Sequence, residues 1–118
     1  MSGKTEARIS ASIGRLVSEQ DLFNQILDLA HIYHWRCAHF RPAMTERGWR
    51  TAVAGDGAGY PDLCMVRLTR VLYAELKSEK GKVTEEQQEW LDALKQTGKV
   101  EVYVWRPSDF YEIAEILK

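Results

Sequence analysis

Three charged residues, Asp62, Glu75 and Lys77, stand in strand-like segments that are otherwise mostly apolar. Strand interiors normally avoid Asp, Glu and Lys, so charges placed there need a reason. Mg²⁺ accepts one or two carboxylates together with water molecules, which suits an acid pair. A lysine beside the pair can orient or deprotonate a water molecule and stabilise developing negative charge. The combination predicts hydrolysis of a phosphodiester bond with the help of a divalent cation.

The strands that carry these residues decide whether the side chains can meet. The runs DLCMVRL and VLYAELK predict an antiparallel hairpin. If its turn is centred between Leu68 and Thr69, Asp62 faces Glu75 with the Cβ atoms roughly 5 Å apart. Glu75 and Lys77 are two residues apart and therefore point to the same side. Leu-Thr is not a favoured two-residue turn, and a shift of one residue would move Asp62 to the other face.

Helical spacing of apolar residues and capping residues predict three helices. In the second of them, Gln87 occupies the capping-box position after Thr84. The predicted helices run over about 19–33 after Ser18, from Thr84 to Gly98, and from Ser108 to near Leu117.

The strands expected beside these helices lie in HWRCAHF, DLCMVRL, VLYAELK and VEVYVW. The segment from Arg41 to Ala58 contains a proline and several glycines and is expected to be a long loop. A strand-helix-strand connection is right-handed, so VLYAELK and VEVYVW should be parallel in one sheet. The expected fold class is α/β, in the order helix, three strands, helix, strand, helix, with a mixed central sheet flanked by helices.

Composition sets the limits for this reading. The chain has 118 residues, of which 45% are hydrophobic and 28% charged, as expected for one globular domain over residues 18–118. Residues 1–17 are expected to be a flexible lead-in. No apolar run reaches the roughly 18 residues of a membrane span, and the N-terminus lacks a secretion signal. We therefore expect a cytoplasmic protein without a membrane partner. With a net charge of −1, binding to a polyanion must depend on local basic clusters.

A group of histidines and a cysteine offers a competing chemistry. His31, His34, Cys37 and His39 lie within nine residues and could form a zinc site in a structural domain. Their spacing is poor, because the first two leave a helix whereas the last two lie on a predicted strand. A further alternative is a nucleic-acid-binding module that keeps the fold but has no activity.

Taken together, the motifs resemble a known group of nucleases. Pro61-Asp62 followed by Glu75-Leu76-Lys77 resembles the PD-(D/E)xK superfamily, whose restriction-endonuclease-like core has the order of elements derived above. More narrowly, GYPDL, AELKSEKGKVTEEQQEWLDAL and VEVYVWRPSD resemble the small stand-alone VRR-Nuc domain proteins, many of them encoded by phages. The resemblance covers about residues 18–112. It implies a metal-dependent DNA endonuclease in the cytoplasm of a bacterial or phage-infected host cell.

The resemblance also implies roles for individual residues. Asp62 and Glu75 would bind Mg²⁺ or Mn²⁺, together with the carbonyl of Leu76, and Lys77 would be the catalytic lysine. Gln87 would reach back toward the site to position water or phosphate, a role compatible with its capping function.

One further acid is expected from the first helix. Glu19 matches the acidic position of the family there and would be an additional metal ligand. Two alternatives remain open: Gln25 could be aligned at this position instead of Glu19, or Glu19 only complements the helix dipole from the first turn.

DNA is the substrate that the resemblance implies. The basic candidates for phosphate contacts are His39 and Arg41 after the first strand, and Lys80 and Lys82 in the turn SEKGK. Solvated surface charge is the alternative for each. Trp49 and Tyr60 could stack on bases or anchor loops. The resemblance further implies a homodimer that acts on branched DNA such as a four-way Holliday junction. The sequence identifies no recruiting protein.

Overall fold

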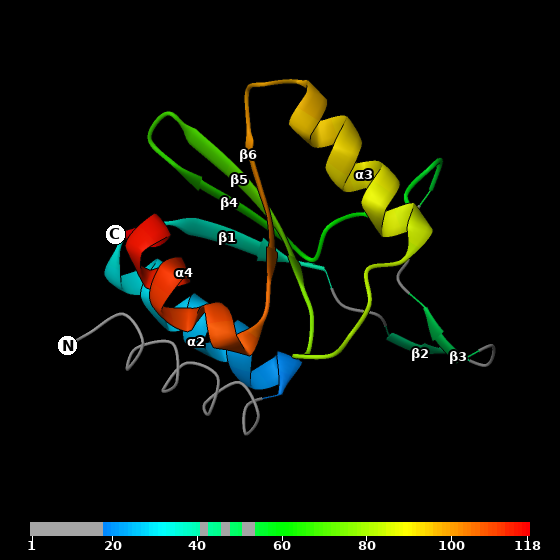
Figure 1. The fold of residues 1–118 in the computed structure, drawn as a ribbon, viewed down its shortest axis with the longest axis horizontal. Coiled ribbons are helices and arrows are strands. Elements are labelled where there is room, and N and C mark those ends of the chain that lie inside the picture. Colours follow the sequence, from blue (N-terminus) through cyan, green and yellow to red (C-terminus); the bar gives the residue numbers. More distant parts are fainter. Residues whose placement is uncertain (1–17, 41–42, 46–47, 51–53) are drawn as a thin grey trace.

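The structure is a computed structural model that describes residues 18–40, 43–45, 48–50 and 54–118. The expectations for residues 1–17 and for Arg41 lie outside the described residues. Figure 1 shows the helices and strands, whose bounds are α2 (Glu19–Ile32), β1 (Arg36–His39), β2 (Ala43–Thr45), β3 (Gly48–Arg50), β4 (Leu63–Arg67), β5 (Arg70–Leu76), α3 (Glu85–Gln96), β6 (Glu101–Trp105), a 3₁₀ turn (Pro107–Asp109) and α4 (Phe110–Leu117).

A four-stranded mixed sheet in the order β1-β4-β5-β6 forms the centre of the fold. The pairs β1–β4 and β4–β5 are antiparallel, and β5–β6 is parallel, as expected for two strands connected through α3. Helices α2 and α4 lie together against one face, whereas α3 lies on the other side beside β6 (Figure 1). The α/β fold class and the parallel pairing expected from the sequence are confirmed.

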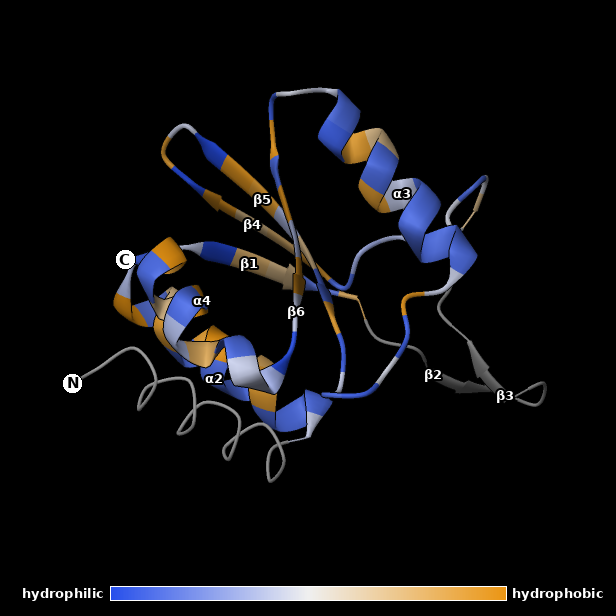
Figure 2. Ribbon diagram, viewed as in Figure 1, coloured by the Kyte–Doolittle hydropathy of each residue, from blue (hydrophilic) through white to orange (hydrophobic). Residues whose placement is uncertain are grey.

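The hydrophobic core lies between the sheet and the helices α2 and α4. Alternate residues of β4 and β5 point into it, so the residues between them point to the α3 side. Figure 2 shows that α3 is mostly hydrophilic, and Leu91 is its buried residue. The core includes Leu22, Ile26 and Ala30 of α2, Leu63 and Met65 of β4, Leu72, Ala74 and Leu76 of β5, and Ile113 and Leu117 of α4. No helix in the described part of the chain is long and apolar enough to cross a membrane.

The β4–β5 turn confirms the register that the sequence left open. Arg67 pairs with Arg70, so Leu68 and Thr69 form a two-residue turn. Leu68 is 94% exposed and has a φ of 54°, a left-handed conformation that is unusual for a residue with a side chain. The paired strands on both sides, rather than the turn sequence, therefore fix this hairpin.

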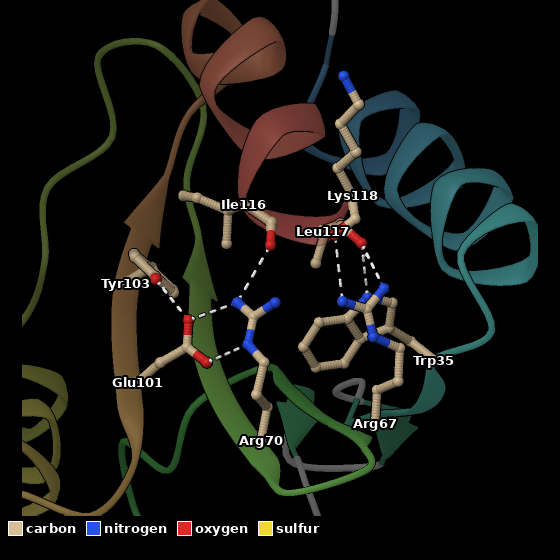
Figure 3. Close-up of polar contacts among 8 residues, drawn as sticks. All are labelled: Trp35, Arg67, Arg70, Glu101, Tyr103, Ile116, Leu117 and Lys118. Atoms are coloured by element: carbon tan, nitrogen blue, oxygen red, sulfur yellow. Dashed lines mark hydrogen bonds and ion pairs between the residues drawn. The ribbon is translucent and has the colours of Figure 1, made fainter.

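A dense polar cluster surrounds this turn on the side of α4 (Figure 3). Arg70 donates to both carboxylate oxygens of Glu101, at 2.8 and 2.7 Å, and to the carbonyl of Ile116 at 3.0 Å. Arg67 donates to the carbonyl of Leu117 at 2.8 Å, and the two guanidinium groups lie over the ring of Trp35 at 4.7 and 4.8 Å from its centroid. The cluster ties the C-terminal end of α4 to the sheet.

Two local predictions are wrong. The expected loop from Arg41 to Ala58 contains a separate two-stranded antiparallel sheet, β2–β3. Its strands of three residues are too short for an alternating pattern to be recognised.

Ser108 does not cap the last helix, because it lies inside the 3₁₀ turn and Asp109 is the N-cap. Proline is tolerated in the first turn of a helix, so the 3₁₀ turn begins at Pro107 and already includes Ser108.

Candidate active site at the open end of the β4–β5 hairpin

Asp62 is held by the two strands that flank it. The pairing of Leu63 with Ala74 continues to Asp62 opposite Glu75, on the face that α2 and α4 leave free. Its Oδ2 atom accepts a hydrogen bond of 2.8 Å from the N–H of Leu76. Its carbonyl accepts one of 2.8 Å from the N–H of Phe40. Both the backbone and the carboxylate of Asp62 are thus fixed at the end of the hairpin.

Glu75 is a buried carboxyl group without full compensation. It is 2% exposed, and its Oε1 atom accepts a hydrogen bond of 3.0 Å from Nε2 of Gln87. Oε2 has no hydrogen-bond partner among the described residues. Burial raises the pKa of Glu75 to about 9, followed by a hydrogen bond that Glu75 and Asp62 can share once one of the two carboxyls is protonated, and by the charge of Asp62. A buried acid pair of this kind favours either a shared proton or a cation.

Lys77 places a positive charge beside this acid pair. Its Nζ atom lies 3.9 Å from Oε1 of Glu75, and its side chain is 14% exposed. The backbone is fixed as well, since the N–H of Lys77 donates to the carbonyl of Trp105 at 3.0 Å. The spacing of two residues along β5 therefore places acid and lysine on one side, as predicted.

Gln87 connects α3 to the acid pair and caps the helix at the same time. Its Oε1 atom accepts from the N–H of Thr84 at 2.9 Å, which leaves Nε2 to donate to Glu75. Gly59 brings the preceding loop against this helix start. It has a φ of 82°, and a Cβ atom there would lie 2.5 Å from the backbone carbon of Glu86. A glycine is therefore required where the loop meets α3.

The chain was compared with models of known protein families. The chain matches the family model of the VRR-NUC domain over residues 4–108. The chain belongs to the VRR-NUC family. The resemblance seen in the sequence motifs is confirmed, and a nuclease-type domain with DNA as substrate follows. Searches of curated proteins and of solved structures gave no significant match.

Glu19 lies at the edge of the acidic centre of this VRR-NUC domain. Partial burial and then the charge of Asp62 raise the pKa of Glu19, whereas Lys77 acts in the opposite direction. Glu19 also lines a pocket of about 230 Å³, whose other lining residues are Gln20, Phe23, His39 and Leu76. Gln25, the alternative for this position, is not among these lining residues.

The basic residues expected to contact DNA fall into different surroundings. His39 stacks on Phe23 with the ring centroids 3.8 Å apart, and it therefore faces α2 rather than the acid pair. Lys80 and Lys82 are exposed in the loop after Lys77.

The loop that carries these lysines is held by Arg106, which sequence reasoning missed. Nη1 of Arg106 donates to the carbonyls of Ser78 at 2.8 Å and Gly81 at 2.6 Å. The signal in the sequence was an arginine directly after the strand that neighbours β5. Its guanidinium group gives the basic loop a defined position beside Lys77.

The acidic residues can be tested against the metals considered. Within the described residues, no group of three or more His, Cys, Asp or Glu side chains could hold a metal ion. The zinc alternative at His31, His34, Cys37 and His39 is therefore wrong, and Cys37 and Cys64 are free and half-buried. The acid pair remains, with one carboxylate oxygen lacking a partner. Two carboxylates with open positions for water suit Mg²⁺ or Mn²⁺.

Proposed function

We propose that this VRR-NUC domain is a Mg²⁺- or Mn²⁺-dependent DNA endonuclease with Asp62, Glu75 and Lys77 at its centre. The observation that carries the proposal is Glu75, whose buried Oε2 atom has no partner among the described residues although Asp62 and Lys77 stand beside it. An unpaired buried carboxylate destabilises the fold unless a ligand compensates it. A divalent cation provides that compensation.

Asp62 and Glu75 would hold the cation, with the carbonyl of Leu76 as a further oxygen ligand. Glu19 forms no three-residue metal-binding group with them among the described residues and would act from the edge of the site. When bound, the ion supplies positive charge for the phosphate and acidifies a water molecule. Hydrolysis adds the hydroxyl of water to phosphorus, breaks one P–O bond and transfers a proton to the leaving oxygen.

The chain's own residues would orient this step. Lys77 Nζ lies 3.9 Å from Oε1 of Glu75 and would therefore stand close to a phosphate at the acid pair. There it would stabilise negative charge on the phosphate or take part in proton transfer. Gln87 keeps Glu75 in one orientation through its amide, and the helix start at Thr84 fixes that amide in turn. Lys80 and Lys82, with the loop held by Arg106, would contact neighbouring phosphates.

A preference for branched DNA and a homodimer are further parts of the proposal. A single small domain covers few base pairs, and twofold symmetry would bring two such sites to one four-way junction. Light scattering of the protein alone and with a junction would measure the number of chains in the complex.

The decisive experiment is cleavage of labelled linear duplex, single-stranded, flapped and four-way-junction DNA in Mg²⁺, Mn²⁺ or EDTA. Wild type is compared with Lys77→Ala and with Lys95→Ala, which removes an exposed lysine at the other end of α3. We expect cleavage that requires the metal, is lost in Lys77→Ala and is retained in Lys95→Ala.

Folded wild-type protein that cleaves none of these substrates with either metal would overturn the proposal in favour of a binding module without activity. Equal cleavage by Lys77→Ala and wild type would contradict the role given to the acid pair and its lysine.

A further inference from the structure

An exposed aromatic ring stands directly beside the acid pair. The N–H of Phe40 donates to the carbonyl of Asp62, so the two residues are neighbours across β1 and β4. His39 pairs with Leu63 on the α2 side, and the next residue therefore points to the opposite face, which carries Asp62 and Glu75. Phe40 is 42% exposed there, although large apolar side chains are usually buried.

The ring of Phe40 is supported from behind by other aromatic residues. Tyr60 contacts it edge-on, with the ring centroids 5.5 Å apart and the planes at 84°. Tyr60 is itself held by Trp90 at 5.0 Å and by Tyr73 at 6.0 Å. Tyr73 lies on the same face of β5 as Glu75, two residues earlier. This aromatic cluster fixes Phe40 while part of its surface stays open to a ligand.

On the basis of the proposed function, we propose that Phe40 stacks on an unpaired base next to the phosphate that the acid pair engages. Stacking of a base on an aromatic side chain contributes to binding without regard to sequence, because every base has a π-face. Within a duplex these faces are covered by the neighbouring base pairs. Phe40 would therefore determine specificity for single strands, strand ends and branch points over continuous duplex.

This role differs from the stacking expected of Tyr60. Tyr60 is half-buried at the centre of the cluster and anchors the loop against α3. Phe40 is the member that offers its ring to the site, and its position beside Asp62 follows from the strand register alone.

The test measures binding without cleavage, in a Lys77→Ala background. Binding of a single-stranded oligonucleotide containing 2-aminopurine and of a matched duplex is compared for Phe40, Phe40→Ala and Phe40→Trp. Tyr111→Ala is the control, because Tyr111 is 43% exposed but lies on α4, which packs against the other face of the sheet. Thermal denaturation establishes that each variant is folded, and Phe40→Leu keeps an apolar contact for Tyr60 if the alanine variant is not.

We expect Phe40→Ala to bind the single strand about 10- to 100-fold more weakly and the duplex with unchanged affinity. Phe40→Trp and Tyr111→Ala should bind both as the parent does, and the 2-aminopurine fluorescence should change on binding only where residue 40 is aromatic. Unchanged binding of the single strand by folded Phe40→Ala or Phe40→Leu, or an equal loss for duplex and single strand, would overturn the inference. Because no cleavage is involved, these outcomes are separate from a failure of the nuclease assay.

Discussion

Charged residues cluster at both ends of the β4–β5 hairpin, but those at the turn are hydrogen-bonded to partners whereas those at the open end are not fully paired among the described residues. At the turn, Arg70 is bonded to Glu101 and to the end of α4, and Arg67 to the last carbonyls of the chain. At the open end, Glu75 is more deeply buried than any of these and still has an oxygen without a partner among the described residues.

The two glutamates of these clusters show the difference most clearly. Hydrogen bonds from Arg70 lower the pKa of Glu101, so its charge is favoured in the folded state. Burial and Asp62 raise the pKa of Glu75 to about 9, so its charge is disfavoured. Charges at the turn stabilise the fold. Charges at the open end cost stability, and we propose that a bound cation offsets this cost.

Removing a charged group at each end in turn should have the largest effect. Glu75→Gln keeps the shape and the hydrogen bond to Gln87 but removes a charge that would hold the cation. We expect cleavage to fall by about 10²- to 10⁴-fold. Arg70→Ala should leave cleavage per folded molecule unchanged. Initial cleavage rates in Mg²⁺ measure both, and a similar loss in the two variants would contradict the division of roles.

A second change pushes the loop at Gly59 away from the start of α3 and leaves the charged side chains of the acid pair unchanged. Gly59→Ala introduces a Cβ atom 2.5 Å from the backbone of Glu86 at a positive φ, and should lower the free energy of unfolding by roughly 2 to 4 kcal/mol. Gly98→Ala has a similar φ of 65° but meets nothing within 4 Å, so about 1 kcal/mol is expected. Urea denaturation of both variants checks the difference. Equal losses would show that the contact of the loop with α3 does not matter.

At the turn, the expected effect is on stability alone. Arg70→Ala removes the paired hydrogen bonds to Glu101 and the bond to Ile116 in a partly exposed site. We expect the free energy of unfolding to fall by about 1 to 3 kcal/mol. Chemical denaturation measures this value, and a loss of stability confined to Glu75 variants would contradict the structural role of the cluster.

The smallest effect concerns the pH dependence of the metal-free protein. Because the pKa of Glu75 is raised, the contribution of Glu75 to the free energy of unfolding is greatest below its ordinary pKa of 4.5. That contribution declines as pH rises toward about 9. The lowered pKa of Glu101 has the opposite sign, so its contribution is lost as pH falls below the ordinary value of 4.5.

Melting temperatures in EDTA across this pH range separate the two groups. Glu75→Gln should flatten the decline on the neutral and alkaline side, and Glu101→Gln the decline on the acid side. If Glu75→Gln leaves the slope between about pH 5 and 8 unchanged, Glu75 is not the buried acid that the contacts describe.

The sequence predicted the parts of the site that depend on strand geometry. Asp62 and Glu75 meet because side chains alternate along paired strands, and Gln87 serves both cap and site because its amide has two ends. Phe40 was missed because the pairing register of β1 with β4 was not predicted. Arg106 was missed because its contact with the loop at Gly81 joins residues far apart in the sequence. The contact that requires Gly59 likewise depends on where α3 begins, which only the assembled fold defines.

The most direct test of the central claim is to measure Mn²⁺ binding to the acid pair by electron paramagnetic resonance, with single-stranded DNA present. Lys77→Ala, which we expect to be inactive in cleavage, is compared with the double variant Lys77→Ala, Glu75→Gln. The account predicts saturable Mn²⁺ binding in the first and its loss in the second. Equal binding in both, or none in the folded, DNA-bound Lys77→Ala variant, would contradict it.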